Sequence, residues 1–318
     1  MTLNCSSTKT ITFAVALFLI VGLHNCKYVD ESFEDPMETW STKIVPVPDT
    51  GQTISYTSTF GEDSDYSINT PSYTDNGDGT VTDNVTELIW QQSDDDTQRT
   101  WADSQTYCEN LALAGKNDWR LPTMKELSFI LDLGMFTSAI HAVFTGTDPL
   151  KYWSSTAHAD IADNMWYLEF DQGNVLNQSK SNSAYVRCIR GDASSNNFFD
   201  NDNETVTDDQ TGLTWQKVDR ANNTWESALI YCEGLSLAGK TDWRLPTFKE
   251  LQSIVDYSAY APAINTSYFP DTVATRHWTS STNANNIGHA WLVSFHSGFV
   301  YFDVKTDSDY VRCVRGGR

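Results

Sequence analysis

Leu113-Ala-Gly-Lys-Asn-Asp-Trp-Arg-Leu-Pro-Thr-Met-Lys-Glu-Leu127 is the stretch that decides how this chain is organised, because it occurs twice. The second copy is Leu237–Leu251. The two copies differ only at Asn117/Thr241 and Met124/Phe248. A repeat distance of 124 residues is too long for a solenoid unit, so the sequence predicts two tandem copies of one domain.

The repeated stretch carries local signals for backbone structure. Gly115 is placed where a helix ends and a residue with positive φ is needed. Pro122 restricts the residue before it to an extended conformation. Thr123 and Glu126 have the spacing of a capping box, which begins a helix. Each copy therefore predicts a helix end, an extended link and a new helix.

The composition favours compact domains with aromatic cores. Aromatic residues make up 13% of the 318 residues and include 11 Trp, whereas charged residues make up only 20%. The net charge of −21 is spread along the chain. Nucleic acid is therefore not expected as a partner, because the chain has no basic surface to neutralise phosphates.

The N-terminus has the features of an export signal. Lys9 precedes a mainly apolar run from Ile11 to Leu23, which is too short to span a bilayer. Residues 1–25 resemble a bacterial lipoprotein signal peptide, so Cys26 is predicted to be lipidated and to hold the protein on a membrane. The alternative is ordinary secretion with cleavage nearby. Residues 26–45, which lack an apolar period, are predicted to be a tether.

The remaining chain is predicted to form two α+β domains, over residues 46–191 and 195–316. Each has a hairpin opening, two helices and antiparallel strands. The polar residues 46–70 leave two interpretations open, an ordered extension of the first domain or more tether.

Four cysteines remain after the signal and Cys26 are set aside. Each copy has one in a predicted helix and one in its last strand, which predicts the disulfides Cys108–Cys188 and Cys232–Cys313 in an oxidising compartment. A reactive-thiol role is disfavoured because the helix cysteines share a face with core Trp residues.

Several motifs occur in both copies. They are the Trp-Arg-Leu-Pro-Thr motif, the opening Asp75-Asn-Gly-Asp-Gly-Thr-Val-Thr-Asp83, the strand Trp153-Ser-Ser-Thr156 and the ending Val186-Arg-Cys-Ile-Arg-Gly191. With them, the chain from about Pro46 to Gly316 resembles the Lcl C-terminal domain family. The resemblance implies a fold related to C-type lectins and formylglycine-generating enzymes. It also implies bacterial envelope proteins, some of which are adhesins for host polysaccharides, and it carries over no catalytic residue.

The expected function is a non-catalytic binding or adhesion role on the bacterial cell envelope, at the outer membrane or cell surface. The ligand would be a carbohydrate or a host or partner protein. A structural envelope protein without a ligand is the alternative, and a formylglycine-enzyme-like oxidase is disfavoured because all four cysteines are assigned to disulfides. Removing a signal whose only charged residue is Lys9 makes the chain still more acidic, which argues against a sulfated polysaccharide.

The acidic openings of the two copies suggest a calcium site. Its candidate ligands are Asp75, Asp78, Asp83, Asp200, Asp202 and Asp208. A solvated hairpin turn accounts for the same residues and is favoured, since no 12-residue calcium loop with a final Glu is present. No other cofactor is expected.

The copies diverge at residues 134–151 and 257–276, and loops on a rigid frame are common binding sites. The second loop offers Tyr257, Tyr260, Tyr268 and Phe269 as candidate ligand-binding residues. Trp153 and Trp278 are further candidates for stacking on sugar rings, although a core position is favoured.

Arg120 and Arg244 are predicted to form structural ion pairs rather than to bind an anion. Their candidate partners are Asp118/Asp242 or Glu126/Glu250. No His aligns with a His in the other copy, and His277 takes the place of Tyr152, so a His-based site would exist in one domain only.

Overall fold

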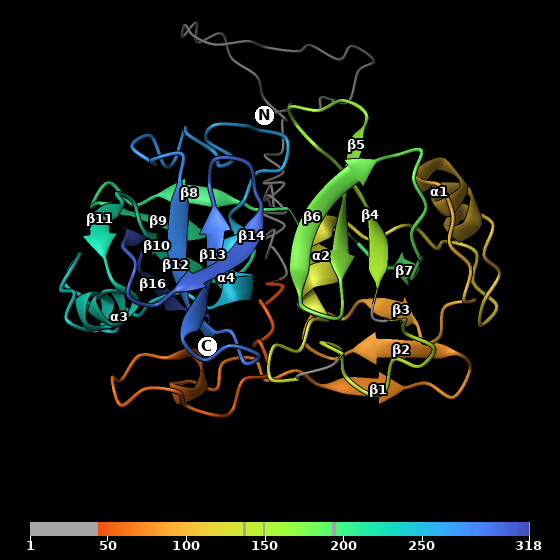
Figure 1. Cartoon of the computed structure of the whole chain (residues 1–318), viewed down its shortest axis with the longest axis horizontal. Helices are drawn as coiled ribbons and strands as arrows, with labels where there is room; N and C mark the ends of the chain where they lie inside the picture. Colours follow the sequence, from red (N-terminus) through yellow and green to blue (C-terminus); the bar gives the residue numbers. More distant parts are fainter. Residues whose placement is uncertain (1–43, 136–137, 149, 193–194, 318) are drawn as a thin grey trace, which may run out of the picture. The chain divides into compact units, whose positions relative to one another are not determined.

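Each repeat combines a small antiparallel sheet with one half of a large sheet that both repeats share (Figure 1). The computed structural model describes residues 44–135, 138–148, 150–192 and 195–317. The predicted signal peptide, Cys26 and nearly all of the predicted tether lie outside these ranges. Within them, no helix has the length and apolar character needed to cross a membrane.

The first repeat is preceded by a 3-10 turn, η1 (Asp63–Asp65). Its elements are β1 (Tyr73–Asp75), β2 (Thr80–Asp83), β3 (Ile89–Gln91), α1 (Trp101–Glu109), α2 (Met124–Phe129), β4 (Lys151–Ala157), β5 (Asn164–Glu169), β6 (Asn174–Ser179) and β7 (Ile189–Arg190).

The second repeat follows the same order with two further short strands. Its elements are β8 (Phe198–Asp200), β9 (Thr205–Asp208), β10 (Leu213–Gln216), β11 (Arg220–Asn223), α3 (Trp225–Glu233), α4 (Phe248–Ser253), β12 (Arg276–Thr282), β13 (His289–Ser294), β14 (Val300–Val304), β15 (Asp309–Val311) and β16 (Val314–Gly316). The predicted α+β class, with two helices in each repeat, is confirmed.

The small sheets have the strand orders β1-β2-β3-β7 and β16-β10-β9-β8. The large sheet has the order β11-β15-β12-β13-β14-β6-β5-β4. All strand pairs in these sheets are antiparallel except β12 with β15.

The predicted capping boxes begin the two short helices. Thr123 Oγ1 accepts a hydrogen bond from the Glu126 amide at 3.3 Å, and the Glu126 carboxylate accepts one from the Thr123 amide at 2.8 Å. Thr247 and Glu250 make the same pair of bonds in the second repeat. Short helices depend on such caps because few of their amides have a partner within the helix.

Both predicted disulfides are confirmed. Cys108 and Cys188 join α1 to the end of the first repeat, and Cys232 and Cys313 do the same in the second. The loops that they close span 80 and 81 residues, so each stabilises its repeat mainly by restricting the unfolded chain.

The two repeats pack about a pseudo-two-fold axis. Val175 of β6 pairs with Val300 of β14, and these residues occupy the same position in their repeats, two residues after Gly173 and Gly298. Helices α2 and α4, which are also equivalent, contact each other. One hydrophobic cluster contains buried residues of both repeats, so they share a core.

The segment before β1 is ordered and packs on the second repeat. Thr57 Oγ1 donates a hydrogen bond to Glu226 at 3.0 Å, and Asn69 Nδ2 donates one to the Gly317 carbonyl at 2.8 Å. The two interpretations left open by the sequence therefore need correction, because residues 46–70 are neither tether nor an extension of the first repeat alone. A polar sequence with scattered apolar residues does not indicate which neighbour it will contact.

Candidate functional site

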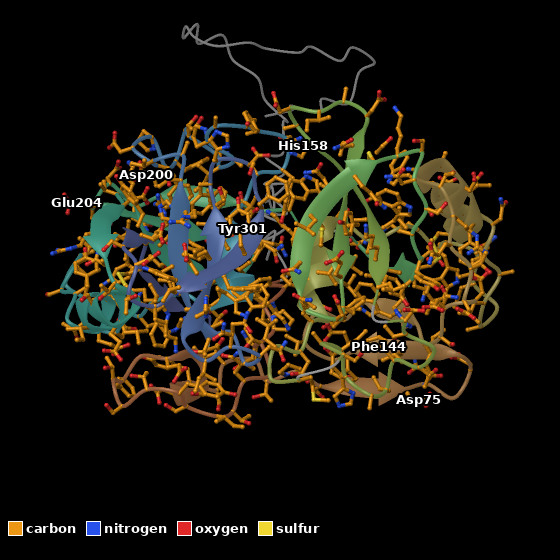
Figure 2. All side chains as sticks on the ribbon, in the orientation of Figure 1. Asp75, Phe144, His158, Asp200, Glu204 and Tyr301 are labelled. Atoms are coloured by element: carbon orange, nitrogen blue, oxygen red, sulfur yellow. A yellow bond between two sulfur atoms is a disulfide. The ribbon has the colours of Figure 1, made fainter. Side chains whose placement is uncertain are left out.

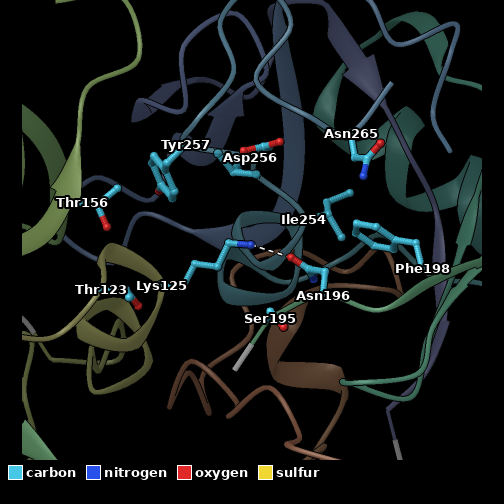
Figure 3. Close-up of a pocket in the computed structure, with 11 residues that line it drawn as sticks. Thr123, Lys125, Thr156, Ser195, Asn196, Phe198, Ile254, Asp256, Tyr257 and Asn265 are labelled. Atoms are coloured by element: carbon cyan, nitrogen blue, oxygen red, sulfur yellow. Dashed lines mark hydrogen bonds between the residues drawn. The ribbon is translucent and has the colours of Figure 1, made fainter. Parts of the chain in front are cut away.

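A cavity of about 350 Å³ opens at the junction of the two repeats (Figure 3). The first repeat contributes the start of α2 and the end of β4, and the second contributes β8 and the turn after α4. The lining residues are Thr123, Lys125, Thr156, Ser195, Asn196, Phe198, Ile254, Val255, Asp256, Tyr257 and Asn265. A volume of this size is at the lower end of the range for small-ligand pockets.

Lys125 provides the cation of the cavity. Its Nζ donates a hydrogen bond to Asn196 Oδ1 at 2.6 Å, as Figure 3 shows. Burial lowers the pKa of the Lys125 ammonium to about 8, although Asp208 and Asp256 act in the opposite direction. An ammonium has three donors, so Lys125 can bind further acceptors from a ligand.

One wall of the cavity is apolar. Phe198, Ile254 and Val255 lie beside the buried Tyr257, whose ring packs edge-on against Trp166 with 5.2 Å between centroids. An apolar wall with a few placed polar groups is the usual composition of a binding pocket.

Of the four aromatic residues predicted to bind a ligand in the second divergent loop, two lie at or beside the cavity and two do not. Tyr257 lines the cavity, and Tyr268 lies partly buried against Phe198, which also lines it. Tyr260 is 41% exposed and contacts the rings of His158 and His296 outside the lining. Phe269 is fully buried, so its interpretation as a ligand-binding residue is wrong.

Trp153 and Trp278 are core residues, and a sugar-stacking role is wrong for both. Each ring is fully buried. Trp153 Nε1 donates a hydrogen bond to the Arg99 carbonyl at 2.9 Å, and Trp278 Nε1 donates one to the Asn223 carbonyl at 2.8 Å. The strands point both indoles inward, where no ring face is left for a ligand.

The six carboxylates proposed for calcium do not come together. Asp75 and Asp200 lie on opposite sides of the view in Figure 2. Asp83 and Asp208 are buried and accept hydrogen bonds from neighbouring hydroxyls at 2.7 and 3.0 Å. The other two, Asp78 and Asp202, lie in the exposed turns. Within the described ranges, no three His, Cys, Asp or Glu residues form a group that could hold a metal ion.

The repeated arginines form structural ion pairs with the glutamates of the capping boxes. Arg120 Nη2 lies 2.6 Å from Glu126 Oε1, and Arg244 Nη1 lies 2.5 Å from Glu250 Oε2. The competing partners, Asp118 and Asp242, instead pair with Arg190 and Arg315. The predicted structural role is thus confirmed, and the pairs tie each extended link to the following helix.

His277 lies at a buried acid–arginine pair rather than in the cavity. Its Nε2 is 3.0 Å from Asp219, which also pairs with Arg312. In the first repeat, Tyr152 takes the place of His277 and bonds to the equivalent acid, Asp94. Both sites are buried below the surface, so they stabilise the fold and offer no access to a ligand.

Ser154 and Thr279 of the repeated strand motif are also structural. Ser154 Oγ donates a hydrogen bond to the Trp166 carbonyl at 2.8 Å, and Thr279 Oγ1 donates one to the Trp291 carbonyl at 2.9 Å. These bonds connect neighbouring strands and leave neither hydroxyl beside a base.

Sequence reasoning missed Lys125, Thr156 and Asn196 as site residues. Lys125 is within the repeated stretch itself, and its copy Lys249 is fully buried. No difference between the two copies indicates that one lysine lines a cavity and the other does not. Asn196 is in the short connector between the repeats. Its place beside α2 depends on how the repeats pack.

Comparison with known proteins identifies one family. The model of the Lcl C-terminal domain matches residues 79–190 and, a second time, residues 204–315. Each match extends from the start of the β2 or β9 hairpin to the last strand of its repeat. No curated protein matches the chain.

Proposed function

Since the chain belongs to the Lcl C-terminal domain family, we propose that it is a non-catalytic binding protein of the bacterial cell envelope. The observation that carries the proposal is the cavity at the junction of the repeats. It combines an apolar wall with the Lys125 ammonium, which has hydrogen-bond donors available for a ligand.

The chemistry of the cavity favours binding over catalysis. Its lining contains no Cys, His or Glu, and its one carboxylate belongs to Asp256. Lys125 bonds to Asn196, and Asp256 bonds to Ser258 outside the lining, so these two ionisable groups are not paired as acid and base. The oxidase alternative needs a reactive thiol, whereas Cys108, Cys188, Cys232 and Cys313 are all held in disulfides.

Lipidation of Cys26 would place this cavity on a membrane, at the outer membrane or cell surface. The support is the short apolar run that ends near Cys26. If the Cys26→Ala variant partitions into detergent as the wild type does, the anchor lies elsewhere or is not a lipid.

A binding screen tests the proposed role. The full chain is presented to arrays of neutral glycans and extracellular proteins, together with the variants Lys125→Met and Lys116→Met. Lys116 is an exposed lysine outside the cavity and serves as the matched control. We expect a ligand that the wild type and Lys116→Met retain, and that Lys125→Met binds at least tenfold more weakly.

The structural alternative, an envelope protein without a ligand, predicts a different result. No ligand would then depend on Lys125, although all three proteins would be folded with similar melting temperatures. That outcome would remove the cavity as a binding site.

A further inference from the structure

We infer that the cavity beside Lys125 receives a short loop segment of a partner protein, because the equivalent cleft of the second repeat already holds such a segment of this chain. The inference rests on the proposed function of the cavity as a binding site, and it names the class of ligand. The junction of the repeats has two equivalent clefts. We call the one around Lys249 the filled cleft and the one around Lys125 the open cleft.

The two clefts are equivalent because the repeats are related by the pseudo-two-fold axis. Val175 and Val300 pair with each other on that axis, and α2 contacts α4 beside it. A group at the start of α2 therefore has a counterpart at the start of α4, on the opposite side of the axis.

Hydrogen bonds confirm this equivalence at the start of each helix. The Met124 amide donates to Thr156 Oγ1 at 2.9 Å, and the Phe248 amide donates to Ser281 Oγ at 3.0 Å. Each helix is thus fixed to the end of the neighbouring strand in the same way. Lys125 and Lys249 follow these two amides directly.

The turns after the helices match as well. The amides of Asp132 and Asp256 each donate to the carbonyl of an alanine seven residues later, at 2.9 and 3.0 Å. The next residues, Leu133 and Tyr257, therefore occupy equivalent positions at the edges of the two clefts.

In the filled cleft, backbone carbonyls of the N-terminal segment meet two donors. Lys249 Nζ donates to the Asp49 carbonyl at 2.8 Å. The Leu133 amide donates to the Thr50 carbonyl, also at 2.8 Å. Such contacts recognise the main chain of a polypeptide and do not depend on its side chains.

A side-chain amide completes the binding of this segment. Gln52 Oε1 accepts a hydrogen bond from the Thr282 amide at 3.2 Å, while Gln52 Nε2 donates to the carbonyls of Thr282 and Leu133. Gln52 and Thr282 are both buried. The end of β12 is therefore covered by residues 49–52.

In the open cleft, the corresponding residues line the cavity. Within the part of the chain that the structure describes, Lys125 bonds only to the side chain of Asn196. Among the described residues, neither the Tyr257 amide nor the Thr156 hydroxyl hydrogen has an acceptor. Ala157, the counterpart of Thr282 at the strand end, is exposed. The donors that hold residues 49–52 in one cleft are thus free to hold a ligand in the other.

The segment that corresponds to residues 49–52 in the other repeat cannot fill the open cleft, for a topological reason. A copy of residues 49–52, displaced by one repeat, would be residues 174–177. Those residues already form most of β6 in the large sheet. The described part of the chain therefore supplies one segment for two equivalent clefts.

The charges around the open cleft specify the kind of segment. Asp208 and Asp256 act on Lys125, and the whole chain carries −21, so a polyanion would be repelled. A neutral loop segment with backbone carbonyls for Lys125 and the Tyr257 amide fits the donors present. A side-chain amide in the position of Gln52 would bind the exposed end of β4.

The test uses a synthetic peptide with blocked ends and the sequence of Val47–Thr53, which contains the residues held in the filled cleft, with the substitution Asp49→Asn so that the peptide is neutral. Its binding to the full chain is measured by isothermal titration calorimetry, with Lys125→Met and the matched control Lys116→Met. We expect saturable binding to the wild type and the control, at least tenfold weaker binding to Lys125→Met, and weaker binding of a peptide with Ala in place of Gln52. Unchanged melting temperatures exclude unfolding as the cause.

The other outcomes separate this inference from the proposed function. Binding of a neutral oligosaccharide that depends on Lys125, without binding of the peptide, would overturn the polypeptide ligand and leave the binding role intact. Peptide binding that is equal in Lys125→Met would place the contact elsewhere and overturn the inference. Failure of both peptide and glycans to bind would overturn the inference and the proposed function together.

Discussion

Lys125 and Lys249 occupy the same position in two nearly identical stretches, yet their surroundings differ. Lys249 is fully buried and donates to the carbonyls of Asp49 and Phe129, both at 2.8 Å. Lys125 is half-buried beside a cavity and bonds to one side chain. The difference arises because residues 49–52 cover only one side of the pseudo-two-fold axis. An internal repeat can thus use one copy of a site for stability and leave the other accessible.

The largest expected effect on stability comes from removing a disulfide, a feature that both repeats have. Replacing both cysteines of one disulfide by Ser should destabilise the protein by about 2–5 kcal/mol, because each bridge restricts a long loop in the unfolded chain. The loops are nearly equal in length, so Cys108/Cys188 and Cys232/Cys313 should give similar losses in urea unfolding. If removal of only one of the two disulfides lowered the free energy of unfolding, the two disulfides would not be equivalent.

The next prediction compares the two lysines directly. Lys249→Met leaves two buried carbonyls without a donor, which should cost about 2–4 kcal/mol in the free energy of unfolding. Lys125→Met should cost less than about 1 kcal/mol, because the side chain it leaves unpaired can bond to water. Equal losses in urea unfolding would contradict the assignment of one filled and one open cleft.

Removing the side-chain amide that closes the filled cleft should have a smaller effect. Gln52→Ala exposes the end of β12 and leaves the Thr282 amide and carbonyl unpaired, at a cost of about 1–3 kcal/mol. Hydrogen exchange at Thr282 should become faster, whereas exchange at the equivalent strand end, Ala157, should not change. Unaltered exchange at Thr282 would mean that Gln52 does not protect this strand.

The smallest expected effect is a difference in pH dependence. Asp63 lies in the filled cleft, and its carboxylate accepts hydrogen bonds from Thr50 and Ser281. Burial, together with the nearby charge of Asp49, raises the pKa of Asp63 to about 7. Because the folded pKa lies above the ordinary value of 3.8, the stabilising contribution is complete below pH 4 and is lost as the pH rises through 7.

The variant Asp63→Asn should therefore lose about 1–2 kcal/mol less stability than the wild type between pH 6 and pH 8. The measurement is the urea midpoint at the two pH values, with Asp192→Asn as an exposed control. A wild type and an Asp63→Asn variant with the same pH dependence would show that Asp63 does not titrate in this window.

Features determined by short stretches of sequence could be predicted down to the individual residues. The capping boxes at Thr123 and Thr247 depend on groups three residues apart, so sequence spacing is sufficient. The disulfides could be predicted because the repeat allowed only one consistent pairing. The ion pairs of Arg120 and Arg244 were also foreseen, although the choice of glutamate over aspartate depended on geometry.

The candidate site was predicted only in part. Tyr257 was identified from loop divergence, and it does line the cavity. Phe269 was placed in the wrong environment because the sequence does not show which face of a loop turns inward, whereas the core position favoured for Trp153 and Trp278 is correct. Lys125 and Asn196 could not be found, since they meet only across the junction between the repeats.

The sequence by itself determined the two copies, their helices, their cysteine pairs and the family, because these follow from local spacing and from internal repetition. The tertiary structure alone decided that the two halves share one sheet, that the segment before the first repeat covers the second, and that one of two equivalent clefts stays open. The physical reason is that these features depend on contacts between residues such as Gln52 and Thr282, which are 230 positions apart. Such contacts are set by the packing of the whole chain, and no local pattern encodes them.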